Sequence, residues 1–135
     1  MLSRRLLMPF IFAVIIAGGA VATSAKEWKK IDSTVISNHM DHATIFVPDP
    51  DVYDVRFRMV KLSVAKSAVR ITRVVVTFGN DEQVEIALTD LIPVGGSTKD
   101  LNISGTRYVK RVDFWFDKDS LTGKNASVTL WAYPE

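Results

Sequence analysis

The chain has 135 residues, no cysteine, 17 basic and 15 acidic residues. The absence of cysteine excludes disulfides, cysteine-based zinc sites and thiol nucleophiles. The stability of the fold must therefore come from burying apolar side chains. Arg4 and Arg5 belong to the N-terminal segment discussed next, and the remaining charges balance. Because nucleic-acid binding usually needs a basic surplus, we expect no nucleic-acid partner.

The first 25 residues have the pattern of a signal peptide. A positive start is followed by an apolar run, Leu6 to Ala17, and then by small residues up to Ala25. The apolar run is shorter than the roughly 20 residues of a membrane span. We expect cleavage after Ala25, with Ala22 as the alternative. Residues 26–135 would then form one secreted or periplasmic domain without a membrane span.

The first half of this domain shows the alternating apolar pattern of β-strands. In two segments the alternation slips by one residue, which predicts bulges. Pro48 to Asp51 ends one strand, since proline cannot donate to a ladder. The predicted segments are Lys26–Ile31 with Val35–Ile36 after it, Thr44–Val47, Val55–Val64 and Val69–Phe78, the last two carrying the slips.

The second half alternates strand patterns with turn residues. Gly79 to Glu82 predicts a hairpin loop, Gly95-Gly96 a tight turn, and Gly105 a second turn. The predicted strands are Val84–Leu88, Leu101–Ile103, Tyr108–Phe116 and Ala126–Tyr133.

The predicted elements define the fold class. No window of eleven or more residues keeps the apolar spacing of an amphipathic helix. About eight short strands separated by polar turns, in about 110 residues, predict an all-β fold. We expect an antiparallel β-sandwich, jelly-roll-like or Greek-key.

Several motifs together resemble a known family. They are Trp28, Asp41-x-x-Thr44-Ile45-x-Val47, Phe78-Gly79-Asn80, Ile92-x-x-Gly95-Gly96-Ser97-Thr98-x-Asp100-Leu101, Gly105-x-Arg107-x-Val109-x-x-Val112-x-Phe114 and Val128-x-Leu130-Trp131. The chain resembles small secreted bacterial proteins known only as a domain of unknown function. The resemblance implies an exported β-sandwich and supplies no catalytic residues.

Two groups of side chains could hold a metal ion. His39, Asp41 and His42 offer two imidazoles and a carboxylate, but this spacing converges on one ion only in a helix or special turn. Asp49, Asp51 and Asp54 form an acidic loop that could bind calcium, without EF-hand spacing. The alternative for both groups is a polar loop, and we expect no cofactor.

Two further features have a structural and a functional interpretation. Gly95 to Thr98 could cradle an anion but lacks the following helix of a phosphate loop, which favours a tight turn. If the last two predicted strands pair as a hairpin, Trp115, Trp131 and Tyr133 share its outer face. They would then be structural, or a platform for a sugar ring or a partner protein.

The sequence favours an exported, non-enzymatic β-sandwich of the bacterial periplasm or envelope, with a binding or structural role. Its candidate partners are an envelope glycan or protein. The first alternative is a carbohydrate- or peptide-binding module that uses the aromatic face. The second is a metal-dependent envelope enzyme.

Overall fold

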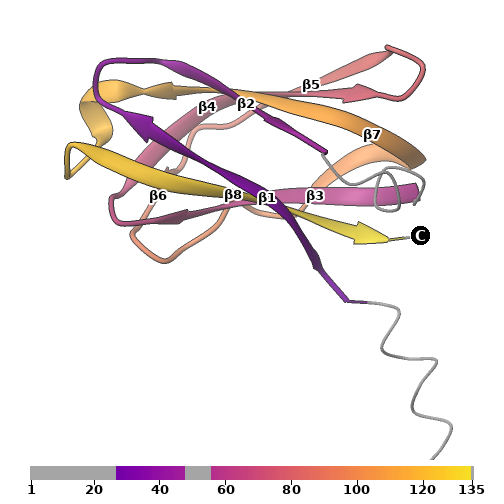
Figure 1. Cartoon of the computed structure of the whole chain (residues 1–135), viewed down its shortest axis with the longest axis horizontal. Coiled ribbons are helices and arrows are strands. Elements are labelled where there is room, and N and C mark those ends of the chain that lie inside the picture. The colour runs from indigo at the N-terminus through magenta and orange to yellow at the C-terminus, as the bar shows by residue number, and fades with distance from the viewer. Residues whose placement is uncertain (1–26, 48–55, 135) are drawn as a thin grey trace, which may run out of the picture.

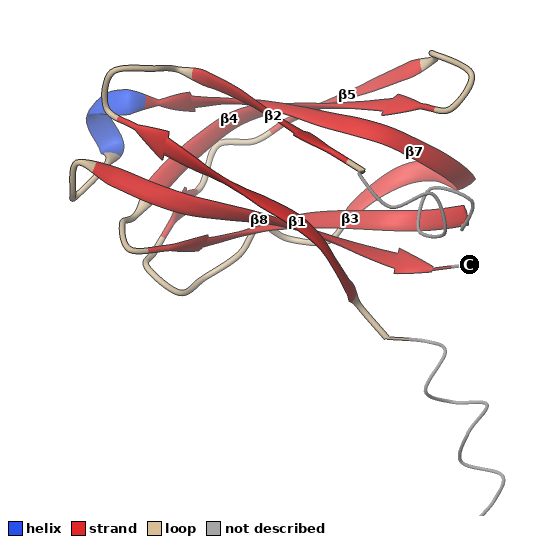
Figure 2. Ribbon diagram, in the orientation of Figure 1, coloured by secondary structure: helices blue, strands red, loops and turns tan. Residues whose placement is uncertain are grey.

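The computed structural model describes residues 27–47 and 56–134 (Figure 1). This part of the chain contains eight β-strands and a single 3-10 turn, η3 (Lys118–Ser120), and no α-helix (Figure 2). The strands are β1 (Lys29–Ser37), β2 (His42–Phe46), β3 (Arg56–Ala65), β4 (Val69–Phe78), β5 (Gln83–Ala87), β6 (Leu91–Ile92), β7 (Leu101–Asp117) and β8 (Asn125–Pro134).

All eight strands join in one antiparallel sheet that is folded into two layers (Figure 1). The strand order is β1-β8-β3-β7-β4-β5, with β2 beside β7 and β6 beside β4. The 17-residue β7 belongs to both layers: Leu101 to Tyr108 pairs with β3, whereas Val109 to Asp117 pairs with β4 and β2. One layer is therefore β1-β8-β3, and the other is β2-β7-β4-β5. The predicted all-β antiparallel sandwich is confirmed.

β7 corrects one prediction. The sequence suggested a short strand, a turn at Gly105 and a second strand, but the chain runs through as a single strand. Ser104 and Gly105 take positive φ angles of 66° and 96°. The register opposite them slips between Phe57 and Met59. Gly105 supplies the left-handed conformation expected of it, but that conformation forms a bulge. The bulge interrupts the pairing with β3 without reversing the chain; this pairing resumes at Arg107 and Tyr108, and β7 pairs with β4 from Val109 onward.

The other slips in alternation also correspond to irregular pairing. The slip predicted in β3 lies beside the register shift at Phe57 and Met59, and the one in β4 matches a shift between Ile71 and Arg73. Both bulges were therefore visible in the sequence.

Alternate residues of both layers fill one apolar core. Phe114 of β7 and Phe57 of β3 are fully buried, together with aliphatic side chains from most of the strands. Each such side chain contributes about 1.5–3 kcal/mol by leaving water. This burial confirms that Val112, Phe114 and Phe116 share the inner face of β7.

The prediction of a hairpin between the last two long strands is wrong. β8 pairs with β1 and β3, while the second half of β7 pairs with β2 and β4. The chain changes layers between β7 and β8, after η3. Val112 and Leu130 still share the core, but they belong to opposite layers. Within the described ranges, no helix has the length and apolar character needed to cross a membrane.

Candidate functional site

A shallow hollow of about 210 Å³ lies on the outer face of the β1-β8-β3 layer. Trp131 is exposed to it because Leu130 and Ala132, its neighbours in β8, point into the core. Lys61 of β3 and Lys30 of β1 lie opposite Trp131 on its two sides. The lining residues are Trp28, Lys61, Ser63, Gly95, Gly96, Ser97 and Trp131.

The aromatic rings around the hollow are held by contacts. Trp131 donates its indole N–H to Ser63 Oγ over 2.9 Å. Trp28, just before β1, meets Tyr133 edge to face, with 5.3 Å between ring centroids. All three rings are partly buried, and Trp and Tyr lose little conformational entropy when they bind. The hollow is therefore bordered by preorganised aromatic surface.

Cations lie over two of these rings. Lys61 Nζ is 4.4 Å from the centroid of Trp28, and Arg58 Cζ is 5.4 Å from that of Tyr133. Such contacts fix the position of the charge and contribute about 0.5–1 kcal/mol at exposed sites. They do not neutralise the charge.

One wall of the hollow, beside β3, is formed by Gly95, Gly96 and Ser97. Gly95 has a φ of 81°, which confirms the predicted tight turn. Its N–H donates to the Val64 carbonyl, and the Gly96 N–H donates to that of Pro93, both over 2.9 Å. Because these amides are already used inside the protein, the segment is not built as an anion cradle of free N–H groups.

Trp115 lies elsewhere, which corrects the predicted three-residue platform. It is on the outer face of the β2-β7-β4-β5 layer, opposite His42 of β2 and Arg73 of β4. Arg73 Cζ is 3.7 Å from its ring centroid, and the His42 ring is 4.5 Å away. Trp131 and Tyr133 share a face, but Trp115 does not.

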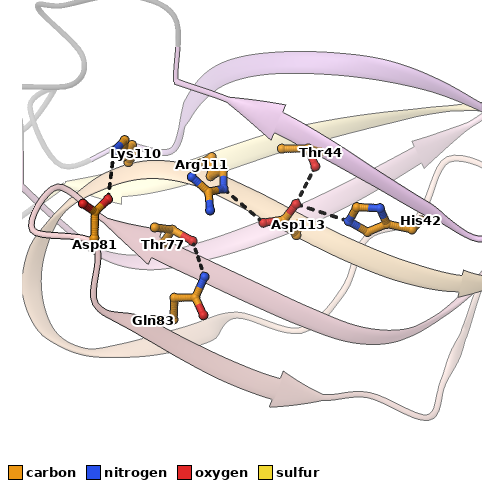
Figure 3. A network of polar contacts seen from close by, with 8 residues as sticks. All are labelled: His42, Thr44, Thr77, Asp81, Gln83, Lys110, Arg111 and Asp113. Carbon is orange, nitrogen blue, oxygen red and sulfur yellow. Dashed lines mark hydrogen bonds and ion pairs between the residues drawn. The ribbon is translucent and has the colours of Figure 1, made fainter.

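The second layer carries a polar network centred on Asp113 (Figure 3). Asp113 Oδ1 accepts a hydrogen bond from the Thr44 hydroxyl and lies 3.2 Å from His42 Nε2. Arg111 Nε lies 3.4 Å from its other oxygen. His42 and Thr44 of β2 and Arg111 of β7 thus contact one partly buried carboxylate. The contacts of Asp113 with His42 and Thr44 connect β2 to β7.

The β4-β5 hairpin adds two ion pairs to this layer. Lys110 Nζ donates to Asp81 over 2.8 Å and lowers the pKa of that carboxyl below its usual value (Figure 3). Arg107 donates to Glu82 and lowers the pKa of Glu82 in the same way. Asp81 takes the positive φ, 70°, that glycine adopts most easily in such turns. The predicted loop at Gly79 to Glu82 is confirmed.

The first predicted metal set does not assemble. The ring of His42 faces Asp113, the backbone N–H of His39 donates to Ser37 Oγ, and the Asp41 carbonyl accepts from the Phe116 N–H. Among residues 27–47 and 56–134, no three His, Asp or Glu side chains are placed to hold a metal ion. The acidic loop of Asp49, Asp51 and Asp54 lies outside the described residues.

Sequence reasoning found Trp131, Tyr133 and the glycine turn, but missed the contributions of Lys61, Ser63 and Trp28 to the same site. Lys61 and Ser63 alternate outward along β3, and this pattern was readable. Their position beside the glycine turn could not be predicted, because Ser63 contacts Ser97 only through a β-bridge between residues that are far apart in the sequence.

Comparison with curated proteins finds no match. The model of one protein family, described as Domain of unknown function (DUF2541), matches residues 7–132. The chain therefore belongs to the DUF2541 family.

Proposed function

We propose that this protein is an exported, non-enzymatic β-sandwich module of the bacterial envelope that binds a saccharide in the hollow beside Trp131. The signal-peptide pattern of the first 25 residues supports export. Recovery of the protein from the periplasm with Lys26 as its first residue would test that part of the proposal.

The observation that carries the binding role is the construction of the hollow. A tryptophan fixed by a hydrogen bond to Ser63 lies beside hydroxyl and ammonium donors, the arrangement with which proteins stack and orient a sugar ring. The volume of the hollow, about 210 Å³, is below the roughly 300–1,000 Å³ of small-molecule pockets. This size suits a single ring of a longer chain.

The chemistry of the lining favours binding over catalysis. The residues around the hollow include no His, Asp or Glu, the side chains that most often transfer protons in hydrolases. Glycoside hydrolysis in most families needs two carboxyl groups across the scissile bond. The lining offers neither.

The test is saccharide binding by purified protein that lacks residues 1–25. We expect Trp131→Ala to weaken binding about five- to 150-fold, because stacking of a ligand ring on an aromatic side chain contributes on the order of 1–3 kcal/mol. Trp115→Ala is the matched control, since it removes the same side chain from the opposite layer. It should leave binding unchanged.

Circular dichroism and thermal unfolding of both variants separate loss of binding from loss of fold. Equal affinity of Trp131→Ala and wild type would refute this site. Absence of binding to any saccharide on a broad array would refute the function.

A further inference from the structure

The strands of the layer that carries the hollow have a surplus of basic over acidic residues. β1, β3 and β8 contain five basic residues and one acidic residue, Asp32. Within the described part of the chain, no carboxylate lies within ion-pair distance of any of the five. The basic residues are Lys29, Lys30, Arg56, Arg58 and Lys61.

In the second layer, several basic side chains lie within ion-pair distance of a carboxylate. Arg73 pairs with Glu85, Lys110 with Asp81, and Arg111 with Asp113. The near-zero balance of charge beyond the N-terminal segment therefore does not describe either layer by itself.

Two lysines flank the central ring of the hollow. Lys30 and Lys61 lie opposite Trp131 on the two neighbouring strands. The Lys61 ammonium is positioned over Trp28 while it lines the hollow. A contact with a ring face leaves N–H donors of an ammonium available, because three point away from its carbon. A negatively charged group above Trp131 would therefore have a lysine on either side.

We infer that the saccharide bound in the hollow is acidic, with its ring against Trp131 and its carboxylate between Lys30 and Lys61. The inference rests on the proposed function and assigns its ligand class. Charge complementarity selects an anion. The aromatic rings are half-buried around a concavity, which suits a sugar ring better than insertion into a lipid surface.

The test compares oligogalacturonate with its methyl ester, which has the same sugar chain without the charge, on an array that also carries neutral glycans. We expect the acid to bind at least tenfold more tightly than the ester, and added salt to reduce this preference. Lys61→Gln and Lys30→Gln should each reduce the preference, while Lys61→Arg should retain it. Lys110→Gln, in the other layer, is the matched control and should have no effect.

Each alternative result has a defined meaning. Equal binding of acid and ester, or binding of neutral glycans alone, overturns the inference and leaves the proposed function standing. Absence of binding to every saccharide overturns both. Binding to a random DNA duplex or to anionic lipid vesicles with the same Lys61 dependence, without glycan binding, assigns the surface to a different ligand and also overturns both.

Discussion

The two outer faces of the sandwich each carry a tryptophan, but their charges are organised in opposite ways. Beside Trp131, cations lie over aromatic rings and have no carboxylate partner among the described residues. Beside Trp115, Arg73 lies over the ring and also pairs with Glu85. On the Trp115 face, Arg73 and Arg111 lie within ion-pair distance of carboxylates of the same layer, although the buried Arg73 Nε makes no hydrogen bond within the described part of the chain. The Trp131 face leaves ammonium groups available, and this difference makes it the candidate binding surface.

The comparison also shows why overall charge predicts little about one surface. Among the described residues, the β4-β5 hairpin and the second half of β7 carry five carboxylates, and both belong to the same layer: Asp81, Glu82, Glu85, Asp113 and Asp117. β3 and β8 contain none. Composition adds these regions together, whereas a ligand meets only one of them.

The largest expected effect is in the core that both faces share. Phe114→Ala should lower the free energy of unfolding by about 3–5 kcal/mol, because its ring is fully buried between the layers. Phe46→Ala is the control, since Phe46 is 60% exposed on β2. It should change stability by less than about 1 kcal/mol. Chemical denaturation measures both, and similar losses for the two variants would contradict the assignment of inside and outside.

A smaller loss is expected from the polar network of the Trp115 face. Asp113→Ala should cost about 1–3 kcal/mol, because it leaves the Thr44 hydroxyl and Arg111 without their acceptor. Asp113→Asn keeps an acceptor oxygen and should cost less. Neither variant should change saccharide binding on the other face. Loss of binding in Asp113→Asn with a native circular-dichroism spectrum would show that the two faces are coupled.

The smallest expected effect is a difference in how the two faces respond to acid. Asp81 and Glu82 have lowered pKa values in the folded state because Lys110 and Arg107 hydrogen-bond to them. Their stabilisation is therefore present above the pKa values of the unfolded chain, near 3.8 and 4.5, and is lost as the pH falls through the lower folded-state values.

Thermal unfolding across this pH range measures the effect. The difference in Tm between wild type and Lys110→Gln should shrink as the pH falls from about 6 to about 3. The difference for Lys61→Gln should stay constant, because a cation above a ring involves no carboxylate. If the Tm difference between wild type and Lys110→Gln did not change with pH, the ion pair between Lys110 and Asp81 would not contribute to the acid response of this layer.

Most of the strands could be located from the sequence because each strand records its own inward and outward residues with a period of two. Val112, Phe114 and Phe116 were assigned to the core in this way, and the burial of all three agrees. The turn at Gly95 was also local information, since a positive φ there favours glycine.

The candidate site could be predicted only in part. Trp131 was recognised as an outward aromatic residue, and the Gly95 turn was recognised as a turn, but nothing in either segment shows that they border the same hollow. Their proximity depends on β3, which pairs with β8 on one side and meets the glycine segment on the other. Long-range pairing of this kind leaves no periodic trace in the sequence.

The sequence by itself determined most of the strands, most of their inner faces and the stabilisation by apolar burial without cysteine. Only the tertiary structure decided that Trp115 and Trp131 lie on opposite faces and that the lysines beside Trp131 have no carboxylate partner among residues 27–47 and 56–134. The physical reason is that alternation distinguishes inside from outside within a strand, while hydrogen bonds between distant strands decide which outer face a side chain joins.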